Sequence, residues 1–325
     1  MQYKLSPCAV NGSTSCFDSA ISAILYNSVP SYLDLYYLFW GFIYTSKGIS
    51  NIKLSERFMV GGLHLQLNDF YNSLFGMKIY EHPKENVSFF LNAVQQETNR
   101  GFALILSIDT YDCPWNVGYR KLHLEHFVVI TGWNEEERTL LCHDAFCGIE
   151  AVDLPVAQLL SMHYIRFFTY RFQQECIQMK SGISLLSQAA EHYAYKEKTY
   201  DNLLAFSQEI AFANLYDQLS SQDMTLLCLD PFFIKFKGVV ASRKNLYYAV
   251  CNVKDTQVRS LMDVCAFQNL CKGYHDVFLL LMKAMSRKGR RSLLQEASEK
   301  LIHIAHMERD YIEEFLAMSQ ESGRK

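Results

Sequence analysis

The chain lacks the features that mark several common classes of protein. Its ten cysteines include no C-x-x-C pair, which argues against a zinc ribbon or a zinc finger. Neither sign of charge dominates: 31 basic and 34 acidic residues give a net charge of −3, which offers no case for nucleic-acid binding. The first residues carry no apolar run of a secretory signal, and scattered thiols suit a reducing compartment, so we expect a cytoplasmic protein.

Long hydrophobic runs are missing as well. The most apolar stretch, residues 35–44, is much shorter than the ~20 residues that span a bilayer. It predicts a buried core segment, and no membrane association is expected. The chain shows no internal repeat, no low-complexity tract and no clear Pro/Gly/Ser linker. With half of its 325 residues hydrophobic, the composition is that of an ordinary globular protein, long enough for two domains.

The hydrophobic pattern changes twice along the chain. It is mainly helical up to about residue 100 and helical again beyond about residue 180. Between these parts come short runs typical of β-strands, at 102–108, 126–131, 139–143 and 164–172. Consecutive strands joined by turns favour antiparallel pairing. We therefore predict an α+β domain over 1–178, with N-terminal helices and an antiparallel sheet, followed by a helical domain over 179–325.

A cysteine lies where a turn becomes a helix. Gly12 and the hydroxyl residues after it are typical of a turn, and apolar residues from Phe17 onward recur with helical spacing. Ser15 and Asp18 fit the capping-box pattern, which makes Ser15 the N-cap and Cys16 the first helical residue. The positive end of the helix dipole favours a thiolate there. Cys16 is therefore a candidate nucleophile; the simpler alternative is a small buried residue at a helix start.

A base and an orienting carboxylate are predicted from one β-hairpin. His126 opens a strand, Asp144 ends the next one, and a turn near 133–137 joins them, so both side chains lie at the same end of the pair. Asp144 can accept the second N–H of the imidazole and fix its tautomer. A cysteine at a helix start followed by a His-strand-turn-strand-Asp unit is the order found in papain-like thiol enzymes.

Residues near this hairpin leave alternatives open. His143 alternates to the opposite face of its strand, so we interpret it as structural, whereas His123 lies in the preceding loop and is a candidate pocket residue. A zinc site from Cys142, His143, Asp144 and Cys147 is disfavoured because strand alternation scatters these ligands. No metal and no resident cofactor are expected.

Further candidates surround the predicted triad. The Asn11 amide is a candidate oxyanion donor, together with the Cys16 backbone N–H. Tyr111 and Trp115, on the loop before His126, are candidate pocket walls that keep water from an acyl-enzyme. The alternatives are that Asn11 belongs to an Asn-Gly turn and that the two aromatic residues are ordinary loop packing.

A basic run stands out in the C-terminal half of this acidic chain. It consists of Arg287, Lys288, Arg290 and Arg291, around a single glycine. Such a run is typical of a solvated connection between helices. It is also a candidate docking site for an acidic partner.

These residues together carry a resemblance to a known family. The chain resembles the butirosin biosynthesis protein H family over roughly residues 1–175. The resemblance rests on Cys16 at a helix start, the aromatic segment 35–44, and the run from Ile108 through His126 to Asp144. It departs from the family just before the cysteine, where a histidine or glycine is common. More distantly, the chain is similar to bacteriocin-processing cysteine peptidases.

The resemblance implies a fold and an activity. It implies a papain-like cysteine-protease fold for the N-terminal domain. Cys16 is then the nucleophile that takes an acyl group from the phosphopantetheinyl thioester of an acyl or peptidyl carrier protein, with His126 as base and Asp144 as its orienting partner. The acyl group passes to an amine, or a hydroxyl, of a small-molecule acceptor.

Three functions follow from these observations. The first is an acyltransferase of natural-product assembly, such as antibiotic biosynthesis. The second is a cysteine peptidase or amidase with the same triad. The third is a non-catalytic binding module in which the helical C-terminal half acts and the triad is incidental.

Overall fold

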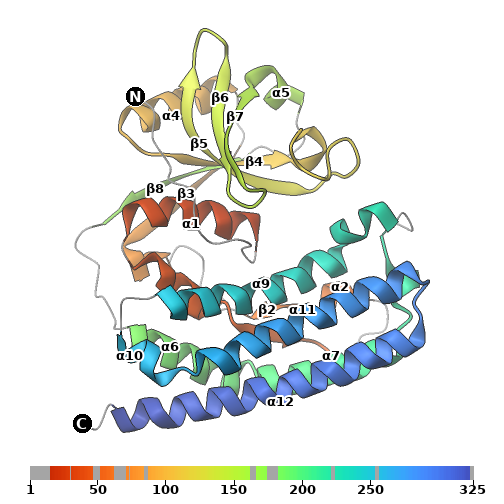
Figure 1. The fold of residues 1–325 in the computed structure, drawn as a ribbon. Helices are drawn as coiled ribbons and strands as arrows, with labels where there is room; N and C mark the ends of the chain where they lie inside the picture. Colours follow the sequence, from red (N-terminus) through yellow and green to blue (C-terminus); the bar gives the residue numbers. More distant parts are fainter. Residues whose placement is uncertain are drawn as a thin grey trace. The chain divides into compact units, whose positions relative to one another are not determined.

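Helices and an antiparallel sheet make up the chain, as a computed structural model shows (Figure 1). The structure describes residues 15–29, 31–46, 52–61, 71–72, 74–83, 87–161, 166–173, 182–220, 224–252 and 256–322. The predicted α+β class, with a helical C-terminal region, is confirmed. Within the described ranges, no helix has both the length and the apolar character needed to cross a bilayer.

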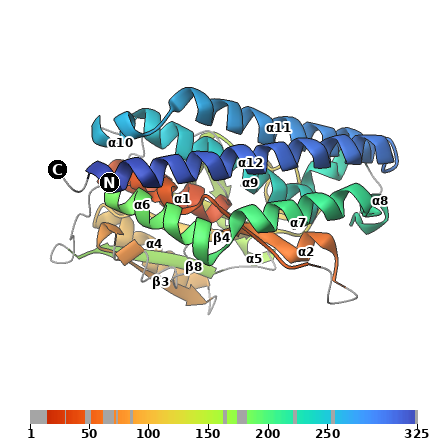
Figure 2. The same cartoon turned by 90° about the horizontal axis from the view of Figure 1, so that it is seen from below.

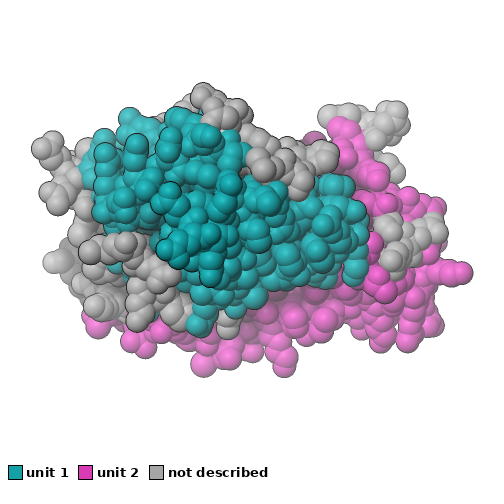
Figure 3. All heavy atoms as spheres, turned by 90° about the horizontal axis from the view of Figure 1, so that it is seen from above, with its two compact units in different colours: residues 1–32, 65–179 teal, residues 33–64, 180–325 magenta. Residues whose placement is uncertain are grey.

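Neither of the two compact units of the chain is one continuous stretch (Figure 3). The first unit contains Met1–Tyr32 and Leu65–Met179, and the second contains Leu33–His64 and Lys180–Lys325. The boundary at 179 lies one residue from the predicted division. The segment Leu33–His64 differs from that division, because it belongs to the unit of the C-terminal helices instead of the N-terminal domain.

The first unit is built around one antiparallel sheet. Among the described residues it has six strands in the order β3-β8-β4-β5-β6-β7, and every neighbouring pair is antiparallel. The strands are β3 (Met77–Pro83), β4 (Leu104–Asp109), β5 (Glu125–Asn134), β6 (Thr139–Asp144), β7 (Ile149–Pro155) and β8 (Arg166–Phe172). Helices with described bounds in this unit include α1 (Cys16–Ser28), α4 (Val87–Asn99) and α5 (Val156–Ser161), and a 3-10 turn lies at Thr110–Asp112.

The predicted hairpin around residues 133–137 is present as β5 and β6. Asn134 closes it, because its side-chain oxygen accepts the backbone N–H groups of Glu136 and Glu137 at 3.1 and 3.2 Å. The strands pair from Asn134 opposite Thr139 back to Val129 opposite His143, with a bulge between Ile130 and Gly132. The hairpin therefore brings the start of β5 and the end of β6 to the same end of the strand pair, as expected.

Helix α4 covers one face of this sheet. Its Phe90 and Val94 enter a core made of alternate strand residues, as the two-residue period of a strand requires. That core includes Leu104, Leu106, Ile108, Val128, Ile130, Leu140, Cys142, Leu154 and Phe167. Burial of these side chains supplies the main favourable free energy of folding for the unit.

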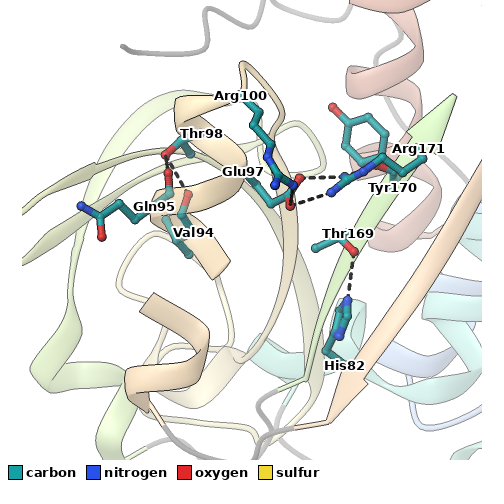
Figure 4. A network of polar contacts seen from close by, with 9 residues as sticks. All are labelled: His82, Val94, Gln95, Glu97, Thr98, Arg100, Thr169, Tyr170 and Arg171. Atoms are coloured by element: carbon teal, nitrogen blue, oxygen red, sulfur yellow. Dashed lines mark hydrogen bonds and ion pairs between the residues drawn. The ribbon is translucent and has the colours of Figure 1, made fainter. Parts of the chain in front are cut away.

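An ion pair joins α4 to β8 beside this core (Figure 4). The Glu97 carboxylate accepts two hydrogen bonds of 2.7 Å from the Arg171 guanidinium, and Glu97 is 5% exposed. On the neighbouring strand pair, the His82 ring lies 2.9 Å from the Thr169 hydroxyl (Figure 4). The fork-to-fork geometry of Glu97 and Arg171 fixes the helix in direction as well as in position.

Long helices dominate the second unit (Figure 2). Helix α12 lies alongside α7 and α11, and α11 lies alongside α9, in both ribbon views. The helices are α2 (Leu54–Arg57), α6 (Gly182–Glu191), α7 (Thr199–Phe212), α8 (Leu215–Gln218), α9 (Pro231–Asn252), α10 (Thr256–Leu261), α11 (Val264–Ser286) and α12 (Arg291–Ser322). A π-helix covers His192–Lys196, and 3-10 helices cover Tyr32–Leu38 and Met224–Leu229.

A two-stranded ribbon explains why Leu33–His64 belongs with these helices. Strands β1 (Gly41–Tyr44) and β2 (Phe58–Gly61) pair antiparallel, with Phe42 opposite Val60. The rings of Phe42 and Phe58 pack on Phe206 of α7, at centroid distances of 5.1 and 4.7 Å. The apolar stretch 35–44 is buried as predicted, but its partners come from residues far along the chain.

A buried ion pair lies among the helices of the second unit. Arg243 of α9 is 0% exposed and Glu308 of α12 is 1% exposed, and Arg243 Nε donates to Glu308 Oε1 at 3.1 Å. Glu308 also accepts from the Trp40 indole and the Tyr274 hydroxyl. These contacts compensate the loss of water around both charges.

Candidate active site

The start of α1 has the predicted cap. Ser15 is the N-cap, with extended backbone angles of φ −147° and ψ 164°. Its hydroxyl oxygen accepts the Asp18 N–H at 3.1 Å and donates to Asp18 Oδ2 at 2.8 Å. Cys16 is therefore the first residue of the helix, next to the backbone N–H groups of the first turn.

Aromatic packing holds this helix start against the start of β5. The Phe17 ring meets the Phe127 ring edge-on at 5.1 Å between centroids, and it meets Phe168 of β8 at 5.2 Å. Phe17 follows Cys16 in the chain, and Phe127 follows His126. The neighbours of these packed rings come together as well, because the Cys16 thiol is near enough to the imidazole to contribute to the raised pKa of His126.

The predicted pair of base and orienting carboxylate is present. His126 Nε2 lies 2.6 Å from Asp144 Oδ2, and the two residues are 2% and 0% exposed. Asp144 is held by two more donors: the Trp115 indole N–H reaches Oδ2 at 2.8 Å, and the Cys147 backbone N–H reaches Oδ1 at 2.9 Å. Both carboxylate oxygens are thus fixed, and they fix the plane and tautomer of the imidazole.

Electrostatics favour the ionised pair. Burial disfavours the charged form of His126, but hydrogen bonds with Asp144, Cys147 and Cys16 outweigh it and raise the pKa of His126 well above its ordinary value. Burial likewise opposes the Asp144 carboxylate, but the bond from His126 outweighs it, and the pKa of Asp144 is lowered. The site therefore stabilises an imidazolium, the form produced when a thiol gives up its proton.

A second thiol, which the sequence did not place in the triad, lies beside the same ring. Cys147 Sγ is 4.0 Å from His126 Nε2 and accepts a hydrogen bond from Asn116 Nδ2 at 3.7 Å. Cys147 follows Asp144 in a tight turn that Gly148 ends with a φ of +72°. The Asp-x-x-Cys-Gly spacing at a strand end was the sequence signal that could have placed Cys147 beside Asp144. A four-residue turn brings its fourth residue back to its first.

Protonation separates the roles of the two thiols. A neutral imidazole that donates Nε2–H to Asp144 has only Nδ1 left to accept a proton. Cys147 lies on the Nε2 side, and burial raises the pKa of its thiol. Cys16 lies at a capped helix start that packs against the start of β5. Of the two, Cys16 remains the candidate nucleophile.

The loop residues before His126 divide between two places. Trp115 binds Asp144 as described, which makes it a positioning residue in this geometry. Tyr111 stacks on His123 at 4.3 Å between centroids, and His123 Nδ1 lies 2.8 Å from Asp109 Oδ2. His123 and Tyr111 therefore form a cluster of their own around Asp109. Asn11, the predicted oxyanion donor, lies outside the described residues.

His143, interpreted from the sequence as structural, is half-buried on β6 opposite Val129. Burial lowers its pKa. The zinc set considered from the sequence does not assemble, because Cys142 enters the apolar core. Ligand-type atoms that do come together belong to His126, Asp144 and Cys147.

The basic residues form the connection between α11 and α12. Arg287 is the C-cap of α11, Arg291 begins α12, and Arg287, Lys288, Arg290 and Arg291 are all exposed. Arg291 also lies over the ring of Phe212, a side chain that is 75% exposed, at 5.6 Å. The helix-connection interpretation is confirmed; docking of a partner remains a proposal.

Comparison with known proteins gives no family for the chain. No protein-family model matches it, and no curated protein matches it. The functional interpretation below therefore depends on the residues of the site.

Proposed function

We propose that this protein is a cysteine-dependent acyltransferase with a papain-like catalytic unit. The observation that carries the proposal is a buried His126, with Nε2 2.6 Å from Asp144, at a strand start on which the capped start of the Cys16 helix packs through Phe17 and Phe127. A nucleophile, a base and a group that orients the base are the parts that covalent acyl transfer needs. An antiparallel sheet beside the cysteine helix is consistent with a papain-like unit.

In the first step, His126 takes the proton of the Cys16 thiol. The thiolate attacks the thioester carbonyl, a new C–S bond forms, and the carrier's thiol leaves with the proton from His126. The Asp144 carboxylate remains charged throughout and stabilises the imidazolium. Backbone N–H groups of the first turn of α1 are the donors that we assign to the oxyanion.

In the second step, an amine attacks the Cys16 thioester. His126 takes the proton that the amine loses, an amide bond forms, and the Cys16 thiol leaves with that proton. An amide is more stable than a thioester, so this step runs downhill. Water is the competing nucleophile, and the 2% exposure of His126 limits its access to the base.

The acyl donor that we propose is the phosphopantetheinyl thioester of a carrier protein. The exposed cations at residues 287–291 are the surface that we assign to an acidic carrier. The acceptor is a small-molecule amine. A peptidase or amidase uses the same triad and is the alternative that the test below separates.

Intact mass spectrometry tests the proposal. The full-length protein is incubated with acyl-carrier thioesters, and we expect an acyl adduct that Cys16→Ala abolishes and that amines discharge faster than water. Cys147→Ala separates the two thiols, because it should still form the adduct. Cys228→Ala, which removes an exposed thiol of the second unit, is the matched control.

The outcomes are distinct. Discharge by water alone would establish a hydrolase. An adduct lost in Cys147→Ala and kept in Cys16→Ala would assign the nucleophile to Cys147. No adduct with any thioester or peptide ester would reject both enzymes and favour the binding module.

A further inference from the structure

Three potential metal ligands of different chemistry come together, and one of them is the proposed catalytic base. They are Nε2 of His126 at the start of β5, Oδ2 of Asp144 at the end of β6, and Sγ of Cys147 in the turn after β6. All three atoms lie within 4.8 Å of one another. Imidazole nitrogen, carboxylate oxygen and thiolate sulfur are the three kinds of ligand that Zn²⁺ takes in proteins.

The spacing of these atoms is close to that of a tetrahedral ion. Zinc bond lengths of about 2.0–2.3 Å place a nitrogen and an oxygen roughly 3.4 Å apart, and a sulfur and a nitrogen roughly 3.6 Å apart. Here Nε2 and Oδ2 are 2.6 Å apart, and Sγ and Nε2 are 4.0 Å apart. To bind the ion, the Nε2–Oδ2 distance must lengthen and the Sγ–Nε2 distance must shorten, each by less than about 1 Å. Small side-chain rotations provide such changes.

Groups outside the three ligands already orient them. The Trp115 indole donates to Asp144 Oδ2 at 2.8 Å, and the Cys147 N–H donates to Asp144 Oδ1 at 2.9 Å. The Asn116 amide donates to Cys147 Sγ at 3.7 Å. Outer hydrogen bonds of this kind hold ligands in metal sites and contribute to affinity.

We propose that His126, Asp144 and Cys147 form a Zn²⁺ site whose occupation switches off the catalytic base. A neutral imidazole that binds an ion through Nε2 carries its one proton on Nδ1, the nitrogen that would otherwise accept the thiol proton, and the Nε2–Asp144 hydrogen bond is lost. Three protein ligands leave a fourth position for water or for an additional ligand. The Zn²⁺ site goes beyond the proposed function and is tested on its own by metal binding, whereas the switch rests on that function.

Calorimetry and cobalt spectroscopy on the full-length protein test the site. We expect Zn²⁺ to bind at one ion per chain, and Co²⁺ to give the charge-transfer absorption of a thiolate ligand. Cys147→Ser should remove that absorption and weaken Zn²⁺ binding by at least about tenfold. Cys16→Ala should keep the absorption. Cys228→Ser and Cys265→Ser, which change exposed thiols, are the matched controls and should bind as the parent does.

Two results would overturn the proposal. One is unchanged Zn²⁺ affinity in Cys147→Ser, with a near-UV circular dichroism spectrum that shows the variant to be folded. The other is a cobalt–thiolate absorption that disappears in Cys16→Ala and persists in Cys147→Ser. A failure of the acyl-adduct experiment leaves both measurements intact, so the two proposals are tested separately.

Discussion

Phe17 and Phe127 pack edge-on at 5.1 Å between ring centroids, and each is the chain neighbour of a predicted catalytic residue. The pair joins the first turn of α1 to the start of β5. Cys16 and His126 are therefore placed by the packing of the residues beside them.

Phe17→Ala should slow the reaction of Cys16 without removing a catalytic group. Loss of the ring contacts with Phe127 and Phe168 frees the helix start, and misplacement by about 1 Å can cost up to about 100-fold in rate. We expect alkylation of Cys16 to slow by about 10-fold or more, measured by peptide mapping after iodoacetamide. Because Phe17 is half-buried, its loss should cost about 2 kcal/mol in urea unfolding. Phe212→Ala, at a 75% exposed ring, should change neither quantity appreciably.

Ser15→Ala should destabilise the start of α1. The substitution removes both the acceptor for the Asp18 N–H and the donor to its carboxylate. Loss of an N-cap costs about 1 kcal/mol, and Ser15→Asn should restore most of it because asparagine also accepts the N–H. Chemical denaturation measures the effect. Equal stability of Ser15→Ala and the parent would show that the cap does not hold Cys16 in place.

Asp144→Asn should lower the pKa of His126. In the parent, burial lowers that pKa but the bonds with Asp144 and the two thiols outweigh it. Without the carboxylate charge, the largest opposing contribution is gone and burial has more effect. An NMR titration of the imidazole should therefore show His126 titrating above its ordinary value in the parent and at lower pH in the variant. An unchanged titration would show that Asp144 is not the orienting partner.

The same pair predicts how stability depends on pH. The raised pKa of His126 stabilises the fold below about pH 6.5, and this contribution is lost as the pH rises through the raised value. The lowered pKa of Asp144 stabilises the fold above about pH 3.8, and this contribution is lost as the pH falls through the lowered value. The difference in unfolding free energy between the parent and Asp144→Asn should be largest between these two pH values. Urea melts across pH 3–9 provide the comparison.

Glu308→Gln should destabilise the second unit strongly. It leaves Arg243, which is 0% exposed, without its countercharge. Breaking a buried ion pair in this way costs about 3–5 kcal/mol. Differential scanning calorimetry should show a lower Tm, whereas Glu313→Gln, at an exposed position of the same helix, should stay close to the parent. A small effect of Glu308→Gln would mean that the Trp40 and Tyr274 bonds hold the glutamine equally well.

Local patterns predicted the elements of the candidate site well. The cap at Ser15, the hairpin between His126 and Asp144, and a buried strand, predicted at 102–108 and found at 104–109, depend on residues close in sequence, and all are present. The outer strands β3 and β7 were not predicted. They lie at the two edges of the sheet, where one side of the strand meets solvent and charged residues interrupt the apolar run.

Contacts between distant parts of the chain were beyond the sequence patterns. Trp115 binds Asp144 across 29 positions, and nothing in the loop sequence distinguishes that role from packing. Similarly, the segment 33–64 finds its aromatic partners in Phe206 and Phe232, more than 100 residues later. Sequence patterns did not place Cys147 beside His126, because its turn was not recognised.

The ribbon β1–β2 has a consequence for the order in which the protein is made. The ribbon leaves the ribosome before the sheet, but Phe42 and Phe58 acquire their partner Phe206 only after α7 has been synthesised. An aromatic segment must therefore wait for its packing partners while the rest of the first unit, Leu65–Met179, emerges. A chain that stops at residue 179 contains every residue of the predicted triad, yet it carries this ribbon without its partners. Such a fragment should aggregate, so the unit that holds the predicted triad depends on the helical unit during biosynthesis.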